Sequence, residues 1–252
     1  MSPSRPPMQL FVDRLLDRSM LGAAETEALL SLGGREVQVR AQLDIVPPGE
    51  EATSAWLVVD GLLGRFGQVI DGRRQITALH IAGDMCNLHA LVTPRMSGAL
   101  QALSAATVIR VDYRDLRHLV RTFPLIAEAF WRDCAAQASI LSQWLVNIGR
   151  RDAQSRLAHL LCELAVRFEQ ARLGNRRAFR LDASQVHIGD ALGLTAVHVN
   201  RVFRVIRDKG LVGAESRTIL IHDWAGLAAL GDFDEAYLHM KSHIVADALT
   251  SA

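Results

Sequence analysis

Residues 184–210 decide the fold of this chain: Ser-Gln-Val-His-Ile-Gly-Asp-Ala-Leu-Gly-Leu-Thr-Ala-Val-His-Val-Asn-Arg-Val-Phe-Arg-Val-Ile-Arg-Asp-Lys-Gly. The stretch predicts a short helix, a tight turn and a second helix. The hydroxyls of Ser184 and Thr195 can cap the two helices, because each can accept a hydrogen bond from a free backbone N–H group. Gly193 ends the first helix where the chain needs positive φ, and Gly210 closes the second. The predicted apolar side of the first helix consists of Val186, Ile188, Ala191 and Leu192.

The second predicted helix is amphipathic. Its apolar side follows the i, i+3, i+4, i+7 spacing of a buried stripe and consists of Val199, Val202, Phe203 and Ile206. Its opposite side consists of Ala196, Val197, Asn200, Arg201, Arg204 and Arg207. A helix pair joined by a glycine turn, with an Arg/Asn face on the second helix, is how many proteins place a helix in the DNA major groove. Such pairs also occur in proteins that never contact DNA.

The residues after the second helix predict a β-hairpin, the wing of a winged helix-turn-helix. Leu211-Val212 leads into a turn over residues 213–217, and Thr218-Ile219-Leu220-Ile221 is the returning strand. The distribution of charge agrees with DNA binding. Residues 1–150 hold 15 Lys/Arg and 15 Asp/Glu, whereas residues 151–217 hold 12 Lys/Arg and 7 Asp/Glu. A basic excess on the segment with the helix pair is what a phosphate-binding surface requires.

Composition excludes several classes of protein. The chain has 252 residues, enough for one large or two ordinary domains. Its apolar runs are too short to span a membrane, and residues 1–7 lack the apolar segment of a secretion signal. Cys86, Cys134 and Cys162 are widely spaced, which argues against a disulfide framework and against a CxxC metal site. We therefore expect a cytoplasmic protein with no metal centre and no cofactor.

Residues 37–111 predict a small antiparallel β-barrel or sandwich, preceded by short helices within residues 10–32. Gly49, Gly61, Gly72 and Gly83 punctuate the segment at intervals of 12, 11 and 11 residues, and many short strands with regular turns are typical of such folds. Asp71-Gly72 is a two-residue hairpin signal. The predicted strands are 37–40, 55–59, 62–66, 75–80, 100–103 and 108–111.

A long helix is predicted from Pro124 to about Ile148, with apolar residues at heptad-like spacing. The sequence shows no evident partner within the chain for its apolar stripe. The stripe that contains Phe130, Ile140 and Leu141 is therefore predicted to be a dimer seam; the alternative is that it packs on the barrel. Residues 149–151, Gly-Arg-Arg, are expected to form a hinge. Asp152 is expected to cap the next helix, and residues 174–177 to form a loop.

A β-roll, a long helix and a winged helix-turn-helix, in this order, resemble the Crp/Fnr family of bacterial transcription regulators. The resemblance rests most specifically on residues 188–194, 195–201 and Gly210-Leu211, with support from the spaced glycines and Ala82-Gly83-Asp84. It implies an α+β fold of three parts. These are an N-terminal antiparallel, cyclic-nucleotide-binding-like β-roll sensor domain (1–123), a dimerisation helix and hinge (124–149), and a winged helix-turn-helix DNA-binding domain (150–252).

The resemblance also implies partners. These are a second copy of the chain and a two-fold symmetric double-stranded DNA operator, whose half-sites lie about one helical turn apart. RNA polymerase is a further partner if the protein is an activator. No membrane is implied.

The resemblance places the recognition positions on Ala196, Val197, Asn200 and Arg201. Arg201 stands where the family keeps an arginine that can pair with guanine O6 and N7. Val197 stands where many members have glutamate, and can offer only an apolar contact, for example to a thymine methyl group. Asn200 and His198 can equally be solvated helix residues. The expected phosphate contacts, which position without specifying sequence, are Ser184, Gln185, Thr195, His198, Arg204 and Arg217.

An effector pocket is expected at Asn87, Leu88, Met96 and Ser97, because the resemblance aligns these residues with the Gly-Glu and Arg-Ser pairs of cyclic-nucleotide binders. Leucine cannot accept a hydrogen bond from ribose, and methionine carries no charge. A cyclic phosphate would be buried without its counter-charge, which is costly. We therefore expect that cyclic AMP does not gate this protein.

The cysteines of the chain bear on two other sensor mechanisms, an iron–sulfur centre and haem. Oxygen-sensing members use an N-terminal cysteine cluster for an iron–sulfur centre, but residues 1–40 contain no cysteine. Cys86 and His89 lie where a haem-sensing member places its iron ligands, although ordinary packing also explains such a pair. A haem- or other small-ligand-gated regulator is therefore one alternative. A cyclic-nucleotide-binding regulatory protein is another.

An enzyme is the remaining class. The sequence has no glycine-rich phosphate loop, nucleophile elbow, HExxH or paired-carboxylate motif. His118, His159 and Asp133 are scattered on predicted helices and are interpreted as surface residues. We expect no catalytic residue.

Overall fold

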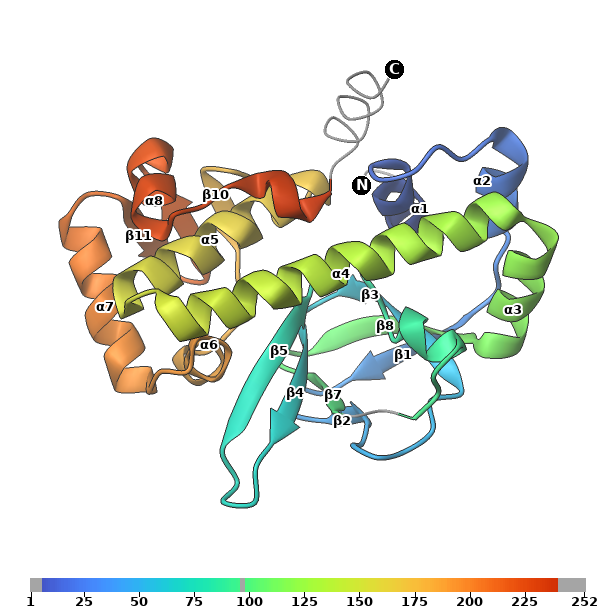
Figure 1. Ribbon diagram of the computed structural model, residues 1–252, viewed down its shortest axis with the longest axis horizontal. Coiled ribbons are helices and arrows are strands. Elements are labelled where there is room, and N and C mark those ends of the chain that lie inside the picture. Colours follow the sequence, from blue (N-terminus) through green and yellow to red (C-terminus); the bar gives the residue numbers. More distant parts are fainter. Residues whose placement is uncertain (1–5, 96–97, 240–252) are drawn as a thin grey trace.

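The computed structural model describes residues 6–95 and 98–239, which form an N-terminal β-roll and a C-terminal helical domain connected by one long helix (Figure 1). The β-roll consists of two four-stranded antiparallel sheets. One sheet has the order β1 (Arg35–Val39), β8 (Ala106–Asp112), β3 (Ser54–Asp60) and β6 (Met85–Cys86). The other has the order β2 (Asp44–Val46), β7 (Ala99–Ala102), β4 (Leu63–Gln68) and β5 (Arg74–His80).

The four spaced glycines lie in turns of the β-roll, and all four adopt positive φ. The hairpin between β4 and β5 differs from the prediction. Its strands stop at Gln68 and Arg74, so five residues connect them where a two-residue turn at Asp71-Gly72 was expected. Gly72 lies within this connection at φ +86°, and its N–H donates to the carbonyl of Val69 over 2.9 Å.

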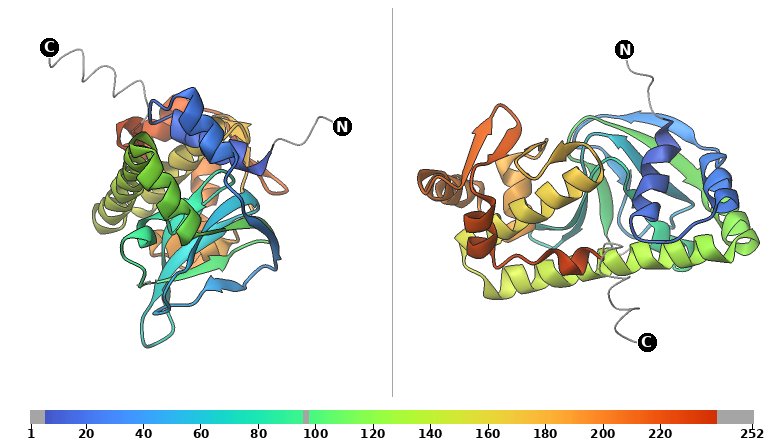
Figure 2. Two further views of the ribbon diagram at one scale, coloured as in Figure 1. Left: turned by 90° about the vertical axis from the view of Figure 1, so that its right-hand side faces the viewer. Right: turned by 90° about the horizontal axis from the view of Figure 1, so that it is seen from above.

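Helices cover the roll. The N-terminal helices α1 (Pro7–Leu16) and α2 (Ala23–Leu30) precede it, and η1 (Leu88–Leu91) follows β6. After β8 come α3 (Tyr113–Thr122) and α4 (Pro124–Arg150). Figures 1 and 2 show that α4 runs the length of the molecule, from the end near α3 to the end near the C-terminal helices. Among the described residues, no helix is long and apolar enough to cross a membrane.

The predicted hinge starts later than expected. Helix α4 continues through Gly149 and ends at Arg150, and Arg151 adopts extended backbone angles. Asp152 then caps α5 (Ala153–Gln170) as predicted, because its carboxylate accepts hydrogen bonds from the N–H groups of Gln154 and Ser155 at 2.9 Å each.

The C-terminal domain combines helices with a third sheet. After α5 its helical elements are α6 (Gln185–Leu192), α7 (Ala196–Asp208), α8 (Trp224–Gly231) and η2 (Glu235–Leu238). Its sheet has the order β11 (Val212–Glu215), β12 (Thr218–Ile221), β10 (Ala178–Arg180) and β9 (Gly174–Asn175). Residues 174–177 are therefore not the simple loop predicted, because Gly174 and Asn175 pair with β10 and extend the wing into a four-stranded sheet.

The apolar core crosses from the β-roll into the C-terminal domain. One buried cluster holds the inner side chains of both β-roll sheets together with α1, α3 and the first half of α4. A second cluster joins Ile76 and Leu79 of β5 to Ile140 and Trp144 of α4 and to α5–α7. Burial of apolar surface is the main favourable term in folding, so this shared core fixes the two domains against each other.

The predicted dimer seam on α4 was partly wrong. Phe130 and Ile140 are buried inside their own chain, because the β-roll and α5 supply the cover that the sequence did not reveal. A different apolar side of the same helix stays uncovered. It includes Leu141, which was part of the prediction, together with Trp131 (71% exposed) and Leu145 (73% exposed).

Candidate nucleic-acid interface

The helix-turn-helix forms with the caps that the sequence predicts. The hydroxyl of Ser184 accepts a hydrogen bond from the N–H of His187, and the Ser184 N–H donates back to Nδ1 of His187, each over 3.2 Å. Thr195 caps α7 through a 3.2 Å hydrogen bond from the N–H of His198. Gly193 ends α6 at φ +66°, a conformation that side chains with a Cβ disfavour. These contacts set the position where α7 begins.

The turn between α6 and α7 is tight because Gly189 has no side chain. A Cβ atom on Gly189 would lie 2.5 Å from the carbonyl oxygen of Leu194. Ile188, Ala191 and Leu192 are buried as predicted, but Val186 is not. Val186 is 52% exposed, because it lies on the side of α6 opposite to Ile188 and Ala191. It therefore belongs to the surface beside α7.

Helix α7 separates its two sides as predicted. Val199, Val202 and Ile206 are buried, and Phe203 packs against the same core. Val197 is 71% exposed, and the other exposed residues of this side are His198, Asn200, Arg201, Arg204 and Arg207. Within the described part of the chain, neither Arg201 nor Arg204 has an ion-pair partner. Their guanidinium groups are therefore available to an anionic partner.

The turn of the wing begins later than predicted and ends at the predicted residue. Strands β11 and β12 pair from Val212 to Ile221, which leaves a two-residue turn at Ser216 and Arg217. Arg217 is exposed and forms a 3.0 Å ion pair with Asp182, which Arg180 also contacts at 2.9 Å. Burial opposes ionisation of Asp182, but hydrogen bonds from the two arginines hold the pKa of its carboxyl below its usual value. The charge of Arg217 is thus partly neutralised.

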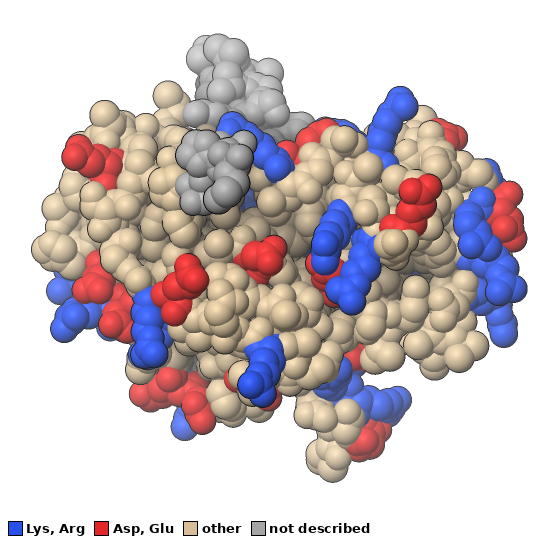
Figure 3. All heavy atoms as spheres, turned by 180° about the vertical axis from the view of Figure 1, so that it is seen from behind, with Lys and Arg blue, Asp and Glu red and all other residues tan. Residues whose placement is uncertain are grey.

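Basic side chains gather at the edge of the molecule where α7 lies. Figure 3 shows the molecule from behind, and Lys and Arg residues line the edge formed by the helix-turn-helix. Acidic and basic side chains are both scattered over the rest of the visible face. The helix-turn-helix therefore presents the electropositive edge that phosphate binding requires.

The β-roll holds the helix-turn-helix through polar contacts to α6. Arg74 of β5 forms a 3.3 Å ion pair with Asp190, and the side-chain amide of Gln75 donates to the carbonyl of Ala191 over 3.0 Å. Gln42, in the turn before β2, lies 3.1 Å from Nε2 of His187. These contacts help to fix the position of the helix-turn-helix relative to the β-roll.

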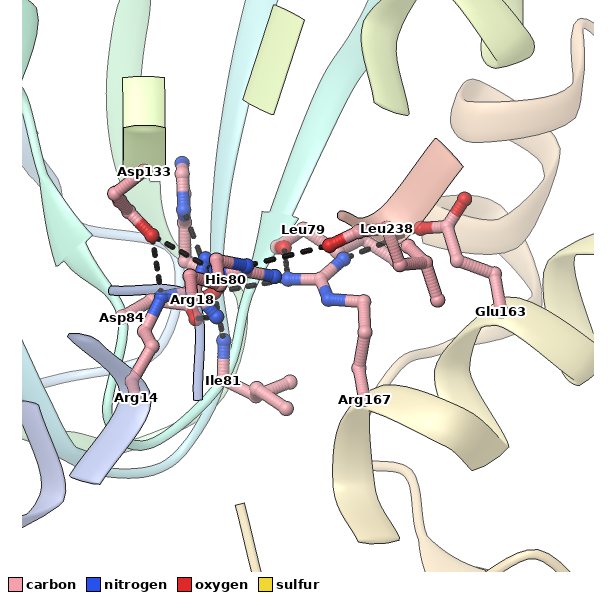
Figure 4. Close-up of polar contacts among 10 residues, drawn as sticks. All are labelled: Arg14, Arg18, Leu79, His80, Ile81, Asp84, Asp133, Glu163, Arg167 and Leu238. Carbon is pink, nitrogen blue, oxygen red and sulfur yellow. Dashed lines mark hydrogen bonds and ion pairs between the residues drawn. The ribbon is translucent and has the colours of Figure 1, made fainter. Parts of the chain in front are cut away.

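A buried charge cluster forms a second connection between the domains (Figure 4). Asp84, in the turn before β6, accepts ion pairs from Arg14 of α1 at 2.7 Å and from Arg167 of α5 at 2.9 Å. Asp133 of α4 accepts ion pairs from Arg14 at 2.9 Å and Arg18 at 2.8 Å. Asp133 is 2% exposed, so its prediction as a surface residue was wrong.

Arg167 reaches from the DNA-binding domain into the β-roll. Its guanidinium donates to the carbonyl of Leu79 over 2.7 Å and pairs with Glu163 at 3.2 Å. Glu163 also accepts hydrogen bonds from Trp144 Nε1 at 2.9 Å and from the Tyr237 hydroxyl at 3.0 Å. Burial raises the pKa of Glu163 above its usual value, although these donors oppose the shift.

His159 lies beside this cluster and was also predicted wrongly. It is buried, its Nδ1 lies 3.1 Å from the carbonyl oxygen of Gly231, and burial with the nearby Arg151 lowers its pKa to about 4. His118, in contrast, is exposed as predicted. Periodicity alone could not distinguish the two, because both lie on amphipathic helices.

A cavity of about 340 Å³ lies between the β-roll and α4, at the place where the effector pocket was expected. Asn87 and Leu88 line it, as predicted, whereas Met96 and Ser97 lie outside the described residues. Sequence reasoning missed Arg65 of β4, which also lines the cavity and donates a hydrogen bond to Oδ1 of Asn87. Asn87 adopts a left-handed conformation at φ +65°.

The Cys86–His89 pair does not meet in this cavity. His89 lines it, and burial, with the charge of Arg65 nearby, lowers its pKa to about 4. Cys86 is instead part of the apolar core of the β-roll, where burial raises the pKa of its thiol above the usual value. The described residues contain no group of three or more His, Cys, Asp or Glu side chains that could hold a metal ion.

A β-roll joined by a long helix to an exposed basic helix and a wing defines a DNA-binding regulator. Comparison with known proteins agrees. The cyclic nucleotide-binding domain model matches residues 36–123, and the Crp-like helix-turn-helix domain model matches residues 155–230. The chain belongs to the Crp/Fnr family of transcription regulators, which bind DNA and are not enzymes.

Individual relatives cover most of the chain. The transcriptional activator protein FnrA of Stutzerimonas stutzeri is 30% identical over 182 residues, which is 72% of this chain and 74% of that protein. The fumarate and nitrate reduction regulatory protein of Vibrio cholerae is 25% identical over 210 residues, 83% of this chain and 84% of that protein. The structure of FixK2 from Bradyrhizobium japonicum has a TM-score of 0.70 at 27% identity and covers 79% of this chain and 98% of its own.

Proposed function

We propose that this regulator acts as a homodimer that reads a two-fold symmetric operator with α7. The observation that carries the proposal is the exposed side of α7, where Val197, Asn200 and Arg201 stand next to unpaired Arg204. Side chains in the first turns of a recognition helix reach base edges. Arg201 pairs with a guanine, and Val197 contacts a thymine methyl group. The small side chain of Ala196 leaves room for DNA to approach α7 closely.

Phosphate contacts come from residues around the start of α6 and α7. The hydroxyls of Ser184 and Thr195 accept hydrogen bonds from backbone N–H groups, so each retains an O–H donor for a phosphate oxygen. Helix N-termini themselves favour phosphate. Gln185 and His198 add donors beside these caps. Arg204 supplies a full charge and Arg217 a charge shared with Asp182.

We assign three parts to the chain. These are a sensor domain (1–123), the dimerisation helix and hinge (124–149) and the DNA-binding domain (150–252).

The test is selection of duplexes from a randomised pool by the purified protein. We expect the recovered sequences to share a two-fold symmetric motif whose half-sites lie about one helical turn apart. Each half-site should contain a guanine that is invariant. Recovery of sequences with no common motif would contradict the proposed function.

The dimer forms through the uncovered side of α4. Trp131, Cys134, Ala138, Leu141 and Leu145 alternate at spacings of three and four residues, which is the pattern of a coiled-coil seam. Apolar side chains this exposed on one helix face mark an interaction surface. The partner copy covers this side.

Leu145→Glu is expected to convert the dimer into a monomer at micromolar concentration, because the seam would bury a charge without a partner. Sedimentation velocity measures the change. The matched control is Ile70→Glu, since Ile70 is fully exposed at the tip of the β4–β5 hairpin and the variant should remain dimeric. A wild-type monomer, or a dimer that survives Leu145→Glu, would exclude this seam.

We also propose that cyclic AMP does not gate the regulator, because Leu88 offers the ribose no acceptor. The protein acts in the cytoplasm, where the duplex DNA that it reads is found. RNA polymerase is its partner if it activates transcription, and the similar proteins FnrA and anr are transcriptional activators.

A further inference from the structure

The cavity between the β-roll and α4 contains a positive charge without a counter-charge. Arg65 of β4 is half-buried and lines the cavity. Its guanidinium donates to the neutral side chain of Asn87, and no other residue in the described ranges forms an ion pair with it. Burial holds the pKa of Arg65 below its usual value. A half-buried cation whose side chain pairs only with an amide lacks the counter-charge that would offset its desolvation.

The same wall carries further polar atoms that lack partners. Asn87 is 2% exposed, and its Nδ2 donor is buried without a hydrogen-bond partner among the described residues. His80 is also buried and lines the cavity with an unpartnered Nε2. The lining contains one carboxylate, Asp133, but Arg14 and Arg18 neutralise it. The cavity therefore offers donors and a positive charge with no free anion to match them.

The rest of the lining is largely apolar. It includes Met85 and Leu88 from the β-roll and Ala138 and Leu141 from α4. A volume of about 340 Å³ lies within the range of small-molecule sites, which combine an apolar lining with a few placed polar groups. The ligand that satisfies both the polar and the apolar parts of this lining has a negative head and a short apolar body.

We propose that this cavity binds a small organic carboxylate, with its head on Arg65 and the Nδ2 group of Asn87 and its apolar body between Leu88 and Leu141. The proposal rests on the sensor role proposed above and names the ligand class of that site. A carboxylate accepts two hydrogen bonds from a guanidinium in a fixed planar geometry. It would supply the counter-charge and occupy the free donor of Asn87.

The cavity borders the buried charge cluster, because Asp133 of that cluster lines it. His80 forms part of its wall, and Nδ1 of His80 lies 3.7 Å from the carboxylate of Asp84. Asp84 holds Arg167 of the DNA-binding domain. A bound carboxylate beside His80 adds a negative charge next to the imidazole. It therefore changes how strongly His80 competes with Arg167 for the carboxylate of Asp84. The ligand thus acts on the orientation of the recognition helix through this cluster.

The test is calorimetry on the full-length protein with four carboxylates of increasing apolar size: acetate, butyrate, hexanoate and benzoate. Benzamide serves as the neutral counterpart of benzoate. We expect affinity to rise from acetate to benzoate, and benzamide to bind at least tenfold more weakly than benzoate, because a charge-assisted hydrogen bond is lost. Cyclic AMP, titrated in the same way, should not reach a micromolar dissociation constant.

Arg65→Gln removes the charge of Arg65 and tests its role in binding. We expect this variant to bind benzoate at least tenfold more weakly and benzamide as well as the wild type does, which also shows that the cavity is intact. Arg114→Gln is the control, since Arg114 is an exposed arginine of α3 and the variant should bind as the wild type. Equal benzoate binding by Arg65→Gln, or no binding of any of the four carboxylates at millimolar concentration, would overturn the proposal.

Operator binding forms the second arm. Saturating benzoate is expected to change the operator affinity of the wild type at least threefold and to leave that of Arg65→Gln unchanged. An unchanged wild-type affinity with benzoate bound would overturn the connection through His80. Because calorimetry needs no DNA, failure of the ligand site is distinguishable from failure of the proposed DNA-binding function.

Discussion

Arg167→Met is expected to lower the free energy of unfolding by about 3–5 kcal/mol, the range for removing one partner of a buried ion pair. Methionine fills much of the space but donates no hydrogen bond. Asp84 would lose one of its two arginines, and the carbonyl of Leu79 would lose the guanidinium that satisfies it. Unfolding by urea, followed by circular dichroism, measures the difference.

Arg114→Gln provides the matched comparison for Arg167→Met. The ion pair of Arg114 with Asp115 is at the surface, where such pairs contribute about 0–1 kcal/mol. Asp84→Asn combined with Arg167→Met should cost less than the sum of the two single changes, because the residues contact each other. A loss below about 1 kcal/mol for Arg167→Met would mean that the cluster does not stabilise the fold.

Arg201→Ala is expected to remove the preference of the protein for its operator. A bidentate arginine–guanine pair provides about 1–3 kcal/mol of discrimination against the wrong base. A symmetric dimer loses this contact twice, so roughly 2–6 kcal/mol of discrimination should disappear if the half-sites are independent. Arg201 is exposed on α7 and its side chain forms no hydrogen bond or ion pair in the described structure. The fold should therefore remain intact.

Arg204→Ala and Arg217→Ala are expected to behave differently. Both residues are proposed phosphate contacts, so their loss should weaken binding to every duplex. The slope of log affinity against log salt should fall by about one for each contact removed. The effect of Arg217→Ala should be the smaller, because Asp182 already neutralises part of its charge.

The helix-turn-helix was predictable because its signals are local. Ser184, Gly193 and Thr195 each act on backbone groups within four residues, so their caps and turn follow from the sequence alone. The apolar stripe of α7 needs only the helical period. The strands of the β-roll were predictable for the same reason, apart from the short β2 and β6, which consist of three and two residues.

The covered side of α4 could not be predicted in the same way. Periodicity shows that the helix has apolar residues on more than one side, but not which side another element covers. The contacts of Ile140 and Trp144 with α5 and the β-roll decide this, and they join segments far apart in sequence. Leu141 and Leu145, one residue further along, therefore face outward.

The charge cluster and the cavity depend on tertiary contacts that leave no local signal. Arg18 and Asp133 are 115 residues apart, and Arg167 and Asp84 are 83 apart. Arg65 meets Asn87 across 22 residues and two strands. Glu163 and Arg167, four residues apart among the apolar residues of α5, are a local signal for the buried ion pair that they form.

The most direct test of base reading by α7 compares binding to the selected operator and to a scrambled duplex at one salt concentration. Fluorescence anisotropy with wild type, Arg201→Ala and Arg204→Ala gives the affinity ratio between the two duplexes for each protein. We expect Arg201→Ala to reduce this ratio by about 30-fold or more, while Arg204→Ala lowers both affinities and keeps the ratio. A wild-type ratio in Arg201→Ala would show that α7 does not read bases through Arg201.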